Sequence, residues 1–249
     1  NKAKENPATV LLKAKAQSCV VKNGVAQVTV EHEGQAKVIE ADKVMVCVGF
    51  RPNGKGIGLE EVGVKLDDRG HVVVDEYLRT NVEGIYAIGD VSGAPYLAHK
   101  ASKEGEIAAE VIAGHAGAMM DVVAMPAAIF THPEIATVGL TETDAKKQGR
   151  KYNIGKFPFS VSGRAMAVDM TDGFVKVLTD PDNDDKTLGV TIVGPEAADL
   201  ICECALAMEM HAFAQDVALT VHPHPTLGEG VMEAFKHALG EAVHVMNKK

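Results

Sequence analysis

Residues 80–90 read Thr80-Asn-Val-Glu-Gly-Ile-Tyr-Ala-Ile-Gly-Asp90, and residues 97–101 read Leu97-Ala-His-Lys-Ala101. The apolar run before Gly89 predicts a buried strand that ends in a Gly-Asp turn. A helix is then expected from Leu97 to Ala113, because the pattern is amphipathic and a glycine follows it. A strand, a turn and a helix in this order are typical of an α/β fold with a ligand site at the carboxyl end of the strand.

Asp90 has two interpretations. A carboxylate between a strand end and a helix N-terminus can hold ribose or ribityl hydroxyl groups, while the helix dipole stabilises negative charge on the ligand. A Gly-Asp turn beside an ordinary amphipathic helix would have the same sequence. The residues alone leave both interpretations open.

A second stretch, His222-Pro-His-Pro-Thr-Leu-Gly-Glu229, lies near the C-terminus. Each proline restricts the residue before it to extended backbone, so both histidines are expected on stiff, non-helical chain. Thr226 is expected to cap a helix that continues over 230–245, with Glu229 completing a capping box. His224 and Glu229 also suit an acid/base pair that removes a proton from a thiol. The alternative is that Glu229 only caps the helix.

Together the two stretches resemble the FAD-dependent disulfide reductases, and the second resembles the active-site signature of their dihydrolipoamide dehydrogenase branch. Glutathione reductases have a related His-Pro-Thr with a different continuation. The resemblance implies that His224 and Glu229 are the catalytic acid/base pair. This branch usually has Ser at the position of Gly228, a departure that leaves both catalytic positions intact.

The resemblance also implies that the protein uses FAD and NAD. Asp90 is expected to bind the ribityl chain of FAD. The residues expected along the flavin, at the start of the helix, are Tyr96, Leu97, Ala98 and His99. Gly49 matches the position at which this family touches NAD, and Ala16 is a further NAD match through a poorly marked loop.

Residues 1–53 read as short strands, with hairpin turns at Asn23-Gly24 and Glu33-Gly34. The expected strands are 9–12, 18–21, 25–31, 36–40 and 43–48. In the last of these, residues 44–48 are continuously apolar, which predicts a strand covered on both faces with Cys47 buried in it.

The resemblance implies a fold of mixed α/β and α+β class. Residues 1–53 correspond to the C-terminal part of an NAD-binding domain, and residues 54–123 to the second segment of an FAD-binding domain, both partial and Rossmann-like. From residue 124 the pattern changes to α+β, and residues 124–249 correspond to a dimerisation (interface) domain.

The sequence lacks several parts of the family pattern. No Gly-x-Gly-x-x-Gly occurs, and the run 54–58 has neither the spacing nor the preceding strand of a phosphate loop. The cysteines at positions 19, 47, 202 and 204 lack the Cys-x4-Cys spacing of the redox disulfide, and are interpreted as reduced thiols. The chain is therefore expected to be the C-terminal half of such an enzyme, and inactive alone.

Composition excludes several other classes. Of the 249 residues 46% are hydrophobic and 24% charged, which is typical of a globular protein, and the net charge of −9 argues against a nucleic-acid partner. The apolar runs are too short for a membrane span. No metal is expected, because His222 and His224 have no third ligand at suitable spacing. We expect a cytoplasmic protein, or alternatively one of the mitochondrial matrix.

The activity implied by the resemblance is oxidation of dihydrolipoamide, carried on the lipoyl domain of an acyltransferase, with electrons passing through a redox disulfide and FAD to NAD+. It further implies a homodimer, in which the His-Glu pair of one subunit completes the active site of the other, docked on the core of a 2-oxoacid dehydrogenase complex. Two alternatives stay open. One is a related flavin disulfide reductase for another thiol or a metal ion, and the other is a non-catalytic dimerisation and docking module.

Overall fold

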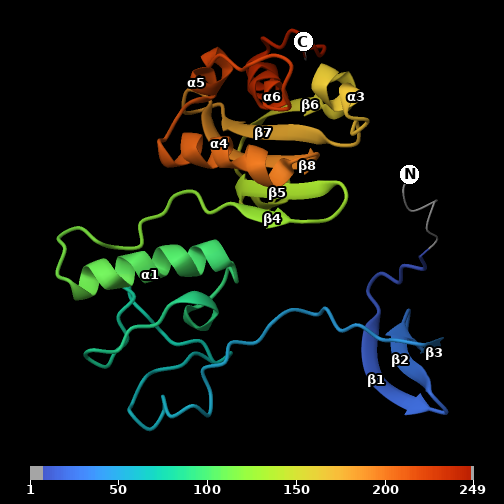
Figure 1. Cartoon of the computed structure of the whole chain (residues 1–249), viewed down its shortest axis with the longest axis vertical. Coiled ribbons are helices and arrows are strands. Elements are labelled where there is room, and N and C mark those ends of the chain that lie inside the picture. The colour runs from blue at the N-terminus through green and yellow to red at the C-terminus, as the bar shows by residue number, and fades with distance from the viewer. Residues whose placement is uncertain (1–7, 248–249) are drawn as a thin grey trace. The chain divides into compact units, whose positions relative to one another are not determined.

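The computed structural model describes residues 8–247 and divides the chain into two compact units, residues 1–51 and residues 52–249. Figure 1 shows strands alone in the first unit, and a helical segment followed by a sheet with covering helices in the second. This mixture of strand and helix confirms the expected fold class.

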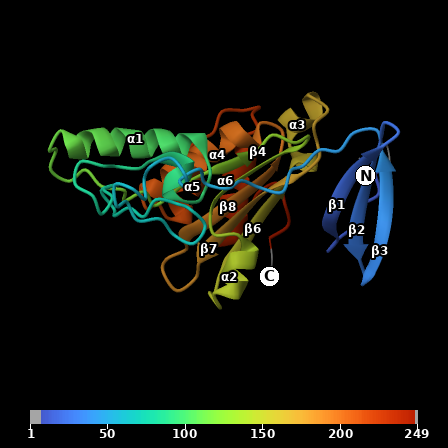
Figure 2. The same ribbon diagram turned by 90° about the horizontal axis from the view of Figure 1, so that it is seen from below.

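The first unit is a three-stranded antiparallel sheet of order β1-β2-β3, formed by β1 (Lys15–Lys22), β2 (Val25–His32) and β3 (Gln35–Ala41) (Figure 2). Both hairpin turns occur where they were expected. Asn23 and Gly24 have φ of 51° and 82°, the positive values that a two-residue hairpin turn of type I′ requires.

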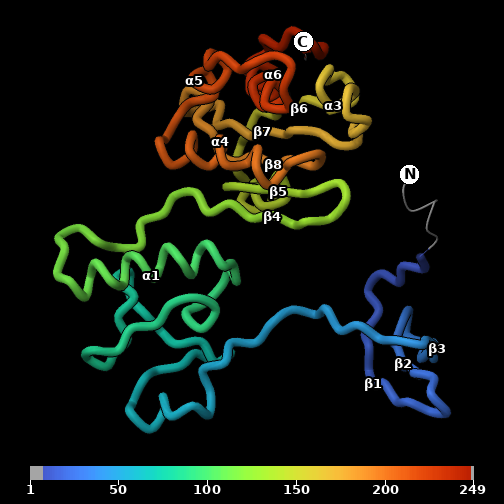
Figure 3. Tube along the Cα trace, viewed as in Figure 1, coloured from blue at the N-terminus to red at the C-terminus, as the bar shows by residue number. Residues whose placement is uncertain are grey.

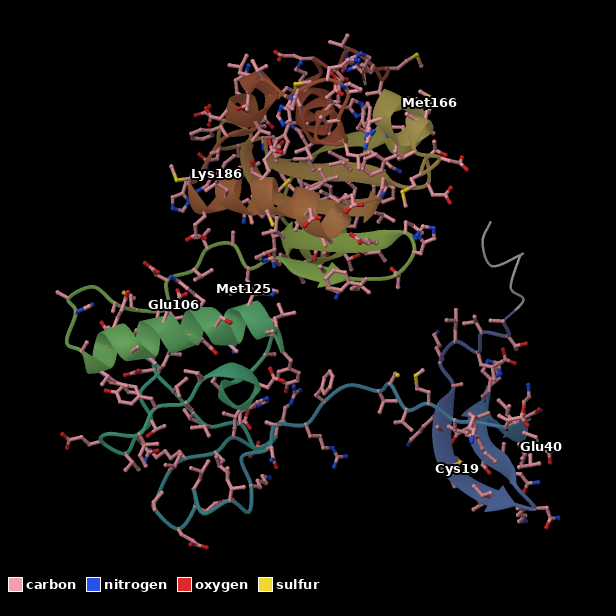
Figure 4. The ribbon with its side chains drawn as sticks, viewed as in Figure 1. Cys19, Glu40, Glu106, Met125, Met166 and Lys186 are labelled. Carbon is pink, nitrogen blue, oxygen red and sulfur yellow. The ribbon has the colours of Figure 1, made fainter. Side chains whose placement is uncertain are left out.

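The expected strands at 9–12 and 43–48 do not form, and this part of the prediction was wrong. Residues 43–48 run as an extended segment without strand pairing (Figure 3), in which Met45 is 81% and Val48 89% exposed. An all-apolar strand needs a neighbour to pair with and a layer on each face, and the described residues give this segment neither. Cys47 is accordingly exposed, as is Cys19 on β1 (Figure 4).

Residues 52–123 contain η2 (Gly89–Ser92) and α1 (Ala98–Ile112). The helix prediction is confirmed, and the Gly114 N–H closes the helix end on the Val111 carbonyl. The expected strand before Gly89 reduces to a single bridge between Arg79 and Tyr86, because no further strand of the described residues pairs with it. The buried face of α1, which includes Ile107 and Val111, packs against Leu78 in a small hydrophobic core.

Residues 124–247 form a five-stranded antiparallel sheet of order β4-β5-β8-β7-β6. Its strands are β4 (Ala127–Ile129), β5 (Glu134–Gly139), β6 (Asn153–Pro158), β7 (Phe174–Asp180) and β8 (Lys186–Gly194). The helices are α2 (Glu142–Lys147), η3 (Phe159–Val161), α3 (Gly163–Ala167), α4 (Ala197–Glu209), α5 (Ala214–Leu219) and α6 (Glu229–Leu239).

One hydrophobic core joins this sheet to its helices. Helix α4 packs over β5 and β8, and α6 packs over β6 and β7. The approach of α6 is so close that a Cβ at Gly155 would overlap the carbonyl of Ala234. Both helices are thereby fixed against the sheet, and they carry the residues of the site described below.

The start of α6 differs from the prediction. Gly228, not Thr226, precedes the first helical residue, and the Thr226 hydroxyl donates to the Pro223 carbonyl (2.7 Å) instead of accepting from the helix. The helix also ends at Gly240 rather than near residue 245, because Gly240 takes a left-handed conformation with φ of 77°. Within the part of the chain that is described, no helix is both long and apolar enough to cross a membrane.

Candidate functional site

The His-Pro-His-Pro stretch and the first turn of α6 bring His224 and Glu229 together. The Nδ1 atom of His224 lies 2.8 Å from Oε1 of Glu229, and Oε2 of Glu229 accepts the backbone N–H of Thr226, also at 2.8 Å. A carboxylate can only accept, so Nδ1 carries the proton and the lone pair lies on Nε2. The His224 side chain is 77% exposed, which leaves it accessible to a substrate from outside the chain.

The environment of Glu229 keeps it ionised. Partial burial raises the pKa of this carboxyl group, but the hydrogen bonds from Thr226 and His224 outweigh burial and hold the pKa below its ordinary value. The position at the N-terminus of α6 also favours negative charge, because the helix dipole is positive there. An ionised Glu229 orients the imidazole and stabilises the imidazolium that forms when Nε2 takes a proton.

A second His-Glu pair, which the sequence did not reveal, lies beside the first. His222 places Nε2 2.7 Å from Oε1 of Glu203 on α4, and Nδ1 2.9 Å from the Thr220 carbonyl. Its side chain is only 6% exposed. Because Glu203 precedes His222 by 19 positions and belongs to another element, no local pattern links the two residues.

The Gly89–Asp90 turn is held by a buried ion pair on α1. Glu104 accepts the Gly89 N–H (2.6 Å), and its Oε1 lies 2.8 Å from Nζ of Lys100. The Lys100 ammonium also donates to the carbonyls of Gly89 and Gly93. Asp90 itself is exposed, and the contacts of Lys100 and Glu104 fix the backbone of the turn that carries it. This support was not predicted, although the i,i+4 spacing of Lys100 and Glu104 is visible in the sequence.

The N-terminus of α1 is open to an anionic or polar ligand. Leu97 precedes the helix in extended backbone and makes no capping hydrogen bond with its side chain, so N–H groups of the first turn remain unmatched by a cap. Ala98 is exposed here, whereas the exposed His99 directs Nε2 to the Pro126 carbonyl at 2.7 Å.

Tyr96 belongs to a chain of polar contacts in front of this helix. Its hydroxyl oxygen lies 2.6 Å from Nε2 of His71, whose Nδ1 lies 2.7 Å from Oδ2 of Asp67. The hydrogen bond from His71 lowers the pKa of Asp67 to about 2. This Asp-His-Tyr arrangement was not predicted either: Asp67 and His71 share one turn, but Tyr96 follows 25 positions later in a separate segment.

The expected NAD contacts lie in the first unit. Gly49 has φ of 104° with open space where a Cβ would stand, so a ligand can approach its backbone closely. Ala16 is an exposed residue of β1, opposite Val30. Throughout residues 8–247, no three His, Cys, Asp or Glu side chains are grouped so that they could hold a metal ion.

The candidate site residues of the second unit fall into two groups. One surrounds Asp90 and the start of α1, and the other surrounds His224. The open helix N-terminus with an exposed carboxylate beside it suits the pyrophosphate and hydroxyl groups of a dinucleotide. The His224–Glu229 pair suits proton transfer to and from a thiol.

Two family models match the chain. The model described as pyridine nucleotide-disulphide oxidoreductase matches residues 2–105, and the one described as its dimerisation domain matches residues 125–235. Among curated proteins, a dihydrolipoyl dehydrogenase of Halobacterium salinarum is 50% identical over 226 residues, covering 91% of this chain and 47% of that protein. The dihydrolipoyl dehydrogenase of Geobacillus stearothermophilus is 46% identical, covering 98% of this chain and 52% of its own. The chain thus spans about half the length of the curated relatives it matches.

Solved structures give the same picture of the fold. The crystal structure of LpdA from Mycobacterium tuberculosis superposes with a TM-score of 0.85 at 28% identity, over 94% of this chain and half of that one. The HOCl-induced flavoprotein disulfide reductase RclA from Escherichia coli superposes with a TM-score of 0.79 over 89% of this chain and 50% of its own. At 22% identity, the second likeness concerns the fold alone.

Proposed function

The chain belongs to the pyridine nucleotide-disulphide oxidoreductase family, and on this premise we propose that it is part of an enzyme that oxidises dihydrolipoamide to lipoamide. The relatives that are about half identical to it bear the name of this activity. The observation that carries the proposal is the 2.8 Å contact between His224 Nδ1 and Glu229 Oε1, with Nε2 left to act as the base.

His224 would take the proton from a thiol of dihydrolipoamide, because Glu229 holds the ring in the tautomer whose Nε2 has a lone pair. The resulting thiolate is the species that attacks a disulfide sulfur in thiol–disulfide exchange. The imidazolium that remains is stabilised by the Glu229 carboxylate. It can return the proton to the thiol that leaves, so the pair serves as base and then as acid.

The cofactors proposed are FAD and NAD. Asp90, Tyr96, Leu97, Ala98 and His99 would hold FAD, which is supported by the exposed carboxylate at Asp90 and the uncapped start of α1. Gly49 and Ala16 would contact NAD. When bound, these groups supply the two-electron redox chemistry that amino-acid side chains lack.

The partners proposed are a second copy of the chain, the lipoyl domain of an acyltransferase and the core of a 2-oxoacid dehydrogenase complex. The dimerisation model over residues 125–235 supports the homodimer. The exposure of the His224 ring supports a site that another subunit completes. The cytoplasm is the proposed compartment, and the domain boundaries at residues 53 and 123 remain predictions.

The test is His224→Gln in the flavin-loaded enzyme. Loss of the base should lower the rate of dihydrolipoamide oxidation by roughly 10²–10⁴-fold while flavin content stays the same. A matched control is His132→Gln, since His132 is another exposed histidine directly before a proline. Equal turnover of the two variants would remove His224 from the mechanism and this proposal with it.

A further inference from the structure

His222 is held more tightly than the histidine that carries the proposed chemistry. Nε2 faces the Glu203 carboxylate at 2.7 Å and Nδ1 faces the Thr220 carbonyl at 2.9 Å. Both oxygens can only accept, so the ring satisfies both contacts when both of its nitrogens donate. A hydrogen bond to a carboxylate is roughly twice as strong as one between neutral groups.

Burial adds to this restraint. The His222 side chain is 6% exposed against 77% for His224, although the two residues are separated only by Pro223. The ring of His222 therefore cannot reorient without leaving its site beside α4. Glu203 is 38% exposed, and it sits on a helix whose inner residues Ile201 and Cys204 are buried in the main core. Packing thus fixes the helix that carries Glu203, and the hydrogen bond to His222 orients its side chain.

The stretch after His222 transmits this position to His224. Pro223 fixes its own φ, and its carbonyl accepts the Thr226 hydroxyl at 2.7 Å. The Thr226 N–H in turn donates to Glu229 at 2.8 Å. The loop is thus tied to α4 before His224 and to α6 after it, so the position of His224 depends on both attachments.

We propose that Glu203 and His222 are positioning residues that hold His224 in place for proton transfer. This inference rests on the proposed function, in which His224 is the base. The simpler alternative is that the Glu203–His222 pair only stabilises the fold, like any satisfied buried histidine. The positioning role predicts that folded protein without the Glu203 hydrogen-bond acceptor loses catalytic rate, whereas the purely stabilising role predicts that it does not.

The test compares Glu203→Ala and Glu203→Gln with Asp199→Ala in the flavin-loaded enzyme. Asp199 is an exposed carboxylate four residues earlier on α4 and serves as the matched control for charge. Loss of the acceptor in Glu203→Ala should lower kcat for dihydrolipoamide oxidation roughly ten- to a hundredfold with KM nearly unchanged, because small displacements of a catalytic group cost rates of this order. Glu203→Gln retains an oxygen that accepts from Nε2 and should recover most of the rate.

Two further readouts separate positioning from stability. Reduction of an artificial dye by NADH passes through the flavin without using the thiol base, so it should be unchanged in Glu203→Ala. The ring nitrogen signals of His224, followed by NMR in this chain, should move in Glu203→Ala and not in Asp199→Ala. A parallel fall of dye reduction and dihydrolipoamide oxidation, or an unchanged kcat in folded Glu203→Ala, would overturn the inference.

The outcomes also distinguish the inference from the proposed function. If His224→Gln lowers turnover and Glu203→Ala does not, only the positioning role is lost. If His224→Gln leaves turnover unchanged, the base assignment itself is lost. Should Glu203→Ala fail to fold, His222→Asn serves in its place, because its shorter side chain cannot span both acceptors, and the same loss of kcat is expected.

Discussion

Gly228 lies at the start of α6 in a conformation that any residue can adopt, with φ of −60° and ψ of −28°. A Cβ there would meet only the His222 ring at 3.4 Å and the Thr226 hydroxyl at 3.7 Å, which are ordinary contacts. We predict that Gly228→Ala stabilises the protein by about 0.4–1 kcal/mol, because alanine has less conformational freedom to lose on folding. Chemical denaturation of both proteins measures the difference.

Gly240 is the control, since a Cβ there would meet nothing within 4 Å and so would not clash either. Its φ of 77° is left-handed, so Gly240→Ala should destabilise by about 1 kcal/mol. The two substitutions add the same atoms without a clash, so the backbone conformation decides the sign of the change in stability. If both variants change the free energy of unfolding in the same direction, the backbone conformations given for Gly228 and Gly240 are contradicted.

Glu142 should make stability depend on pH. Hydrogen bonds from Lys146 (2.7 Å) and Lys176 (3.1 Å) lower its pKa from the ordinary value of 4.5 to about 2. A lowered folded-state pKa contributes stability above pH 4.5 that is lost as the pH falls towards 2. Glu142→Gln should therefore be less stable than the parent protein at neutral pH, and the gap should close between these limits. Chemical denaturation at several pH values measures the difference in stability between the two proteins. A difference that does not change with pH would contradict the lowered pKa of Glu142 as its cause.

At the scale of single residues, the sequence predicted the contact between His224 and Glu229 and missed the contacts between distant residues. The His224–Glu229 pair is five positions apart within one motif, so its geometry follows from the loop and the helix start. The Glu203–His222 and His71–Tyr96 contacts depend on how separate segments pack, which no spacing rule encodes. The roles of Asp90 and Gly49 remain predictions, since they require ligands.

At the scale of elements, the contact of α6 with β6 depends on Gly155. A Cβ at this position would overlap the Ala234 carbonyl and crowd Ala238, so the helix would have to move away from the strand. Gly155→Ala should destabilise the protein by about 3 kcal/mol. Gly163→Ala is the control, because a Cβ there meets nothing within 4 Å. Thermal unfolding compares the two, and equal midpoints would show that α6 is not held as described.

The two hairpins of the first unit were predicted from their turns, whereas two extended segments were wrongly expected to be strands. Strands β5 to β8 and the hairpins of the first unit are bounded by turn residues, and each pairs with a neighbour close in the chain or within the same sheet. Residues 44–48 and 85–88 have the apolar composition of strands, but composition supplies no pairing partner. Strand formation is a property of a pair, so one segment alone cannot determine it.

At the scale of the whole molecule, the division at residue 51 predicts where a protease will cut first. Residues 43–51 are exposed and outside any helix or strand. Trypsin should therefore cleave this chain after Lys43 before it cleaves within the sheet of residues 124–247, whereas Pro52 protects the bond after Arg51. Mass spectrometry of early fragments checks this, with Lys43→Gln as the control that removes the cleavage site. First cleavage within that sheet would contradict the division.

The buried pair of Lys100 and Glu104 also has an evolutionary consequence. Their side chains are 8% and 5% exposed. Replacing either one alone therefore leaves the other as an unpaired buried charge, which lowers the stability of the fold by about 3–5 kcal/mol. Replacing both with apolar residues of similar size removes the two charges together and can be tolerated. Descent by single substitutions must pass through one of the costly intermediates. We therefore expect lineages of this protein to inherit the two residues as a unit, and to exchange them only where other mutations have first supplied spare stability.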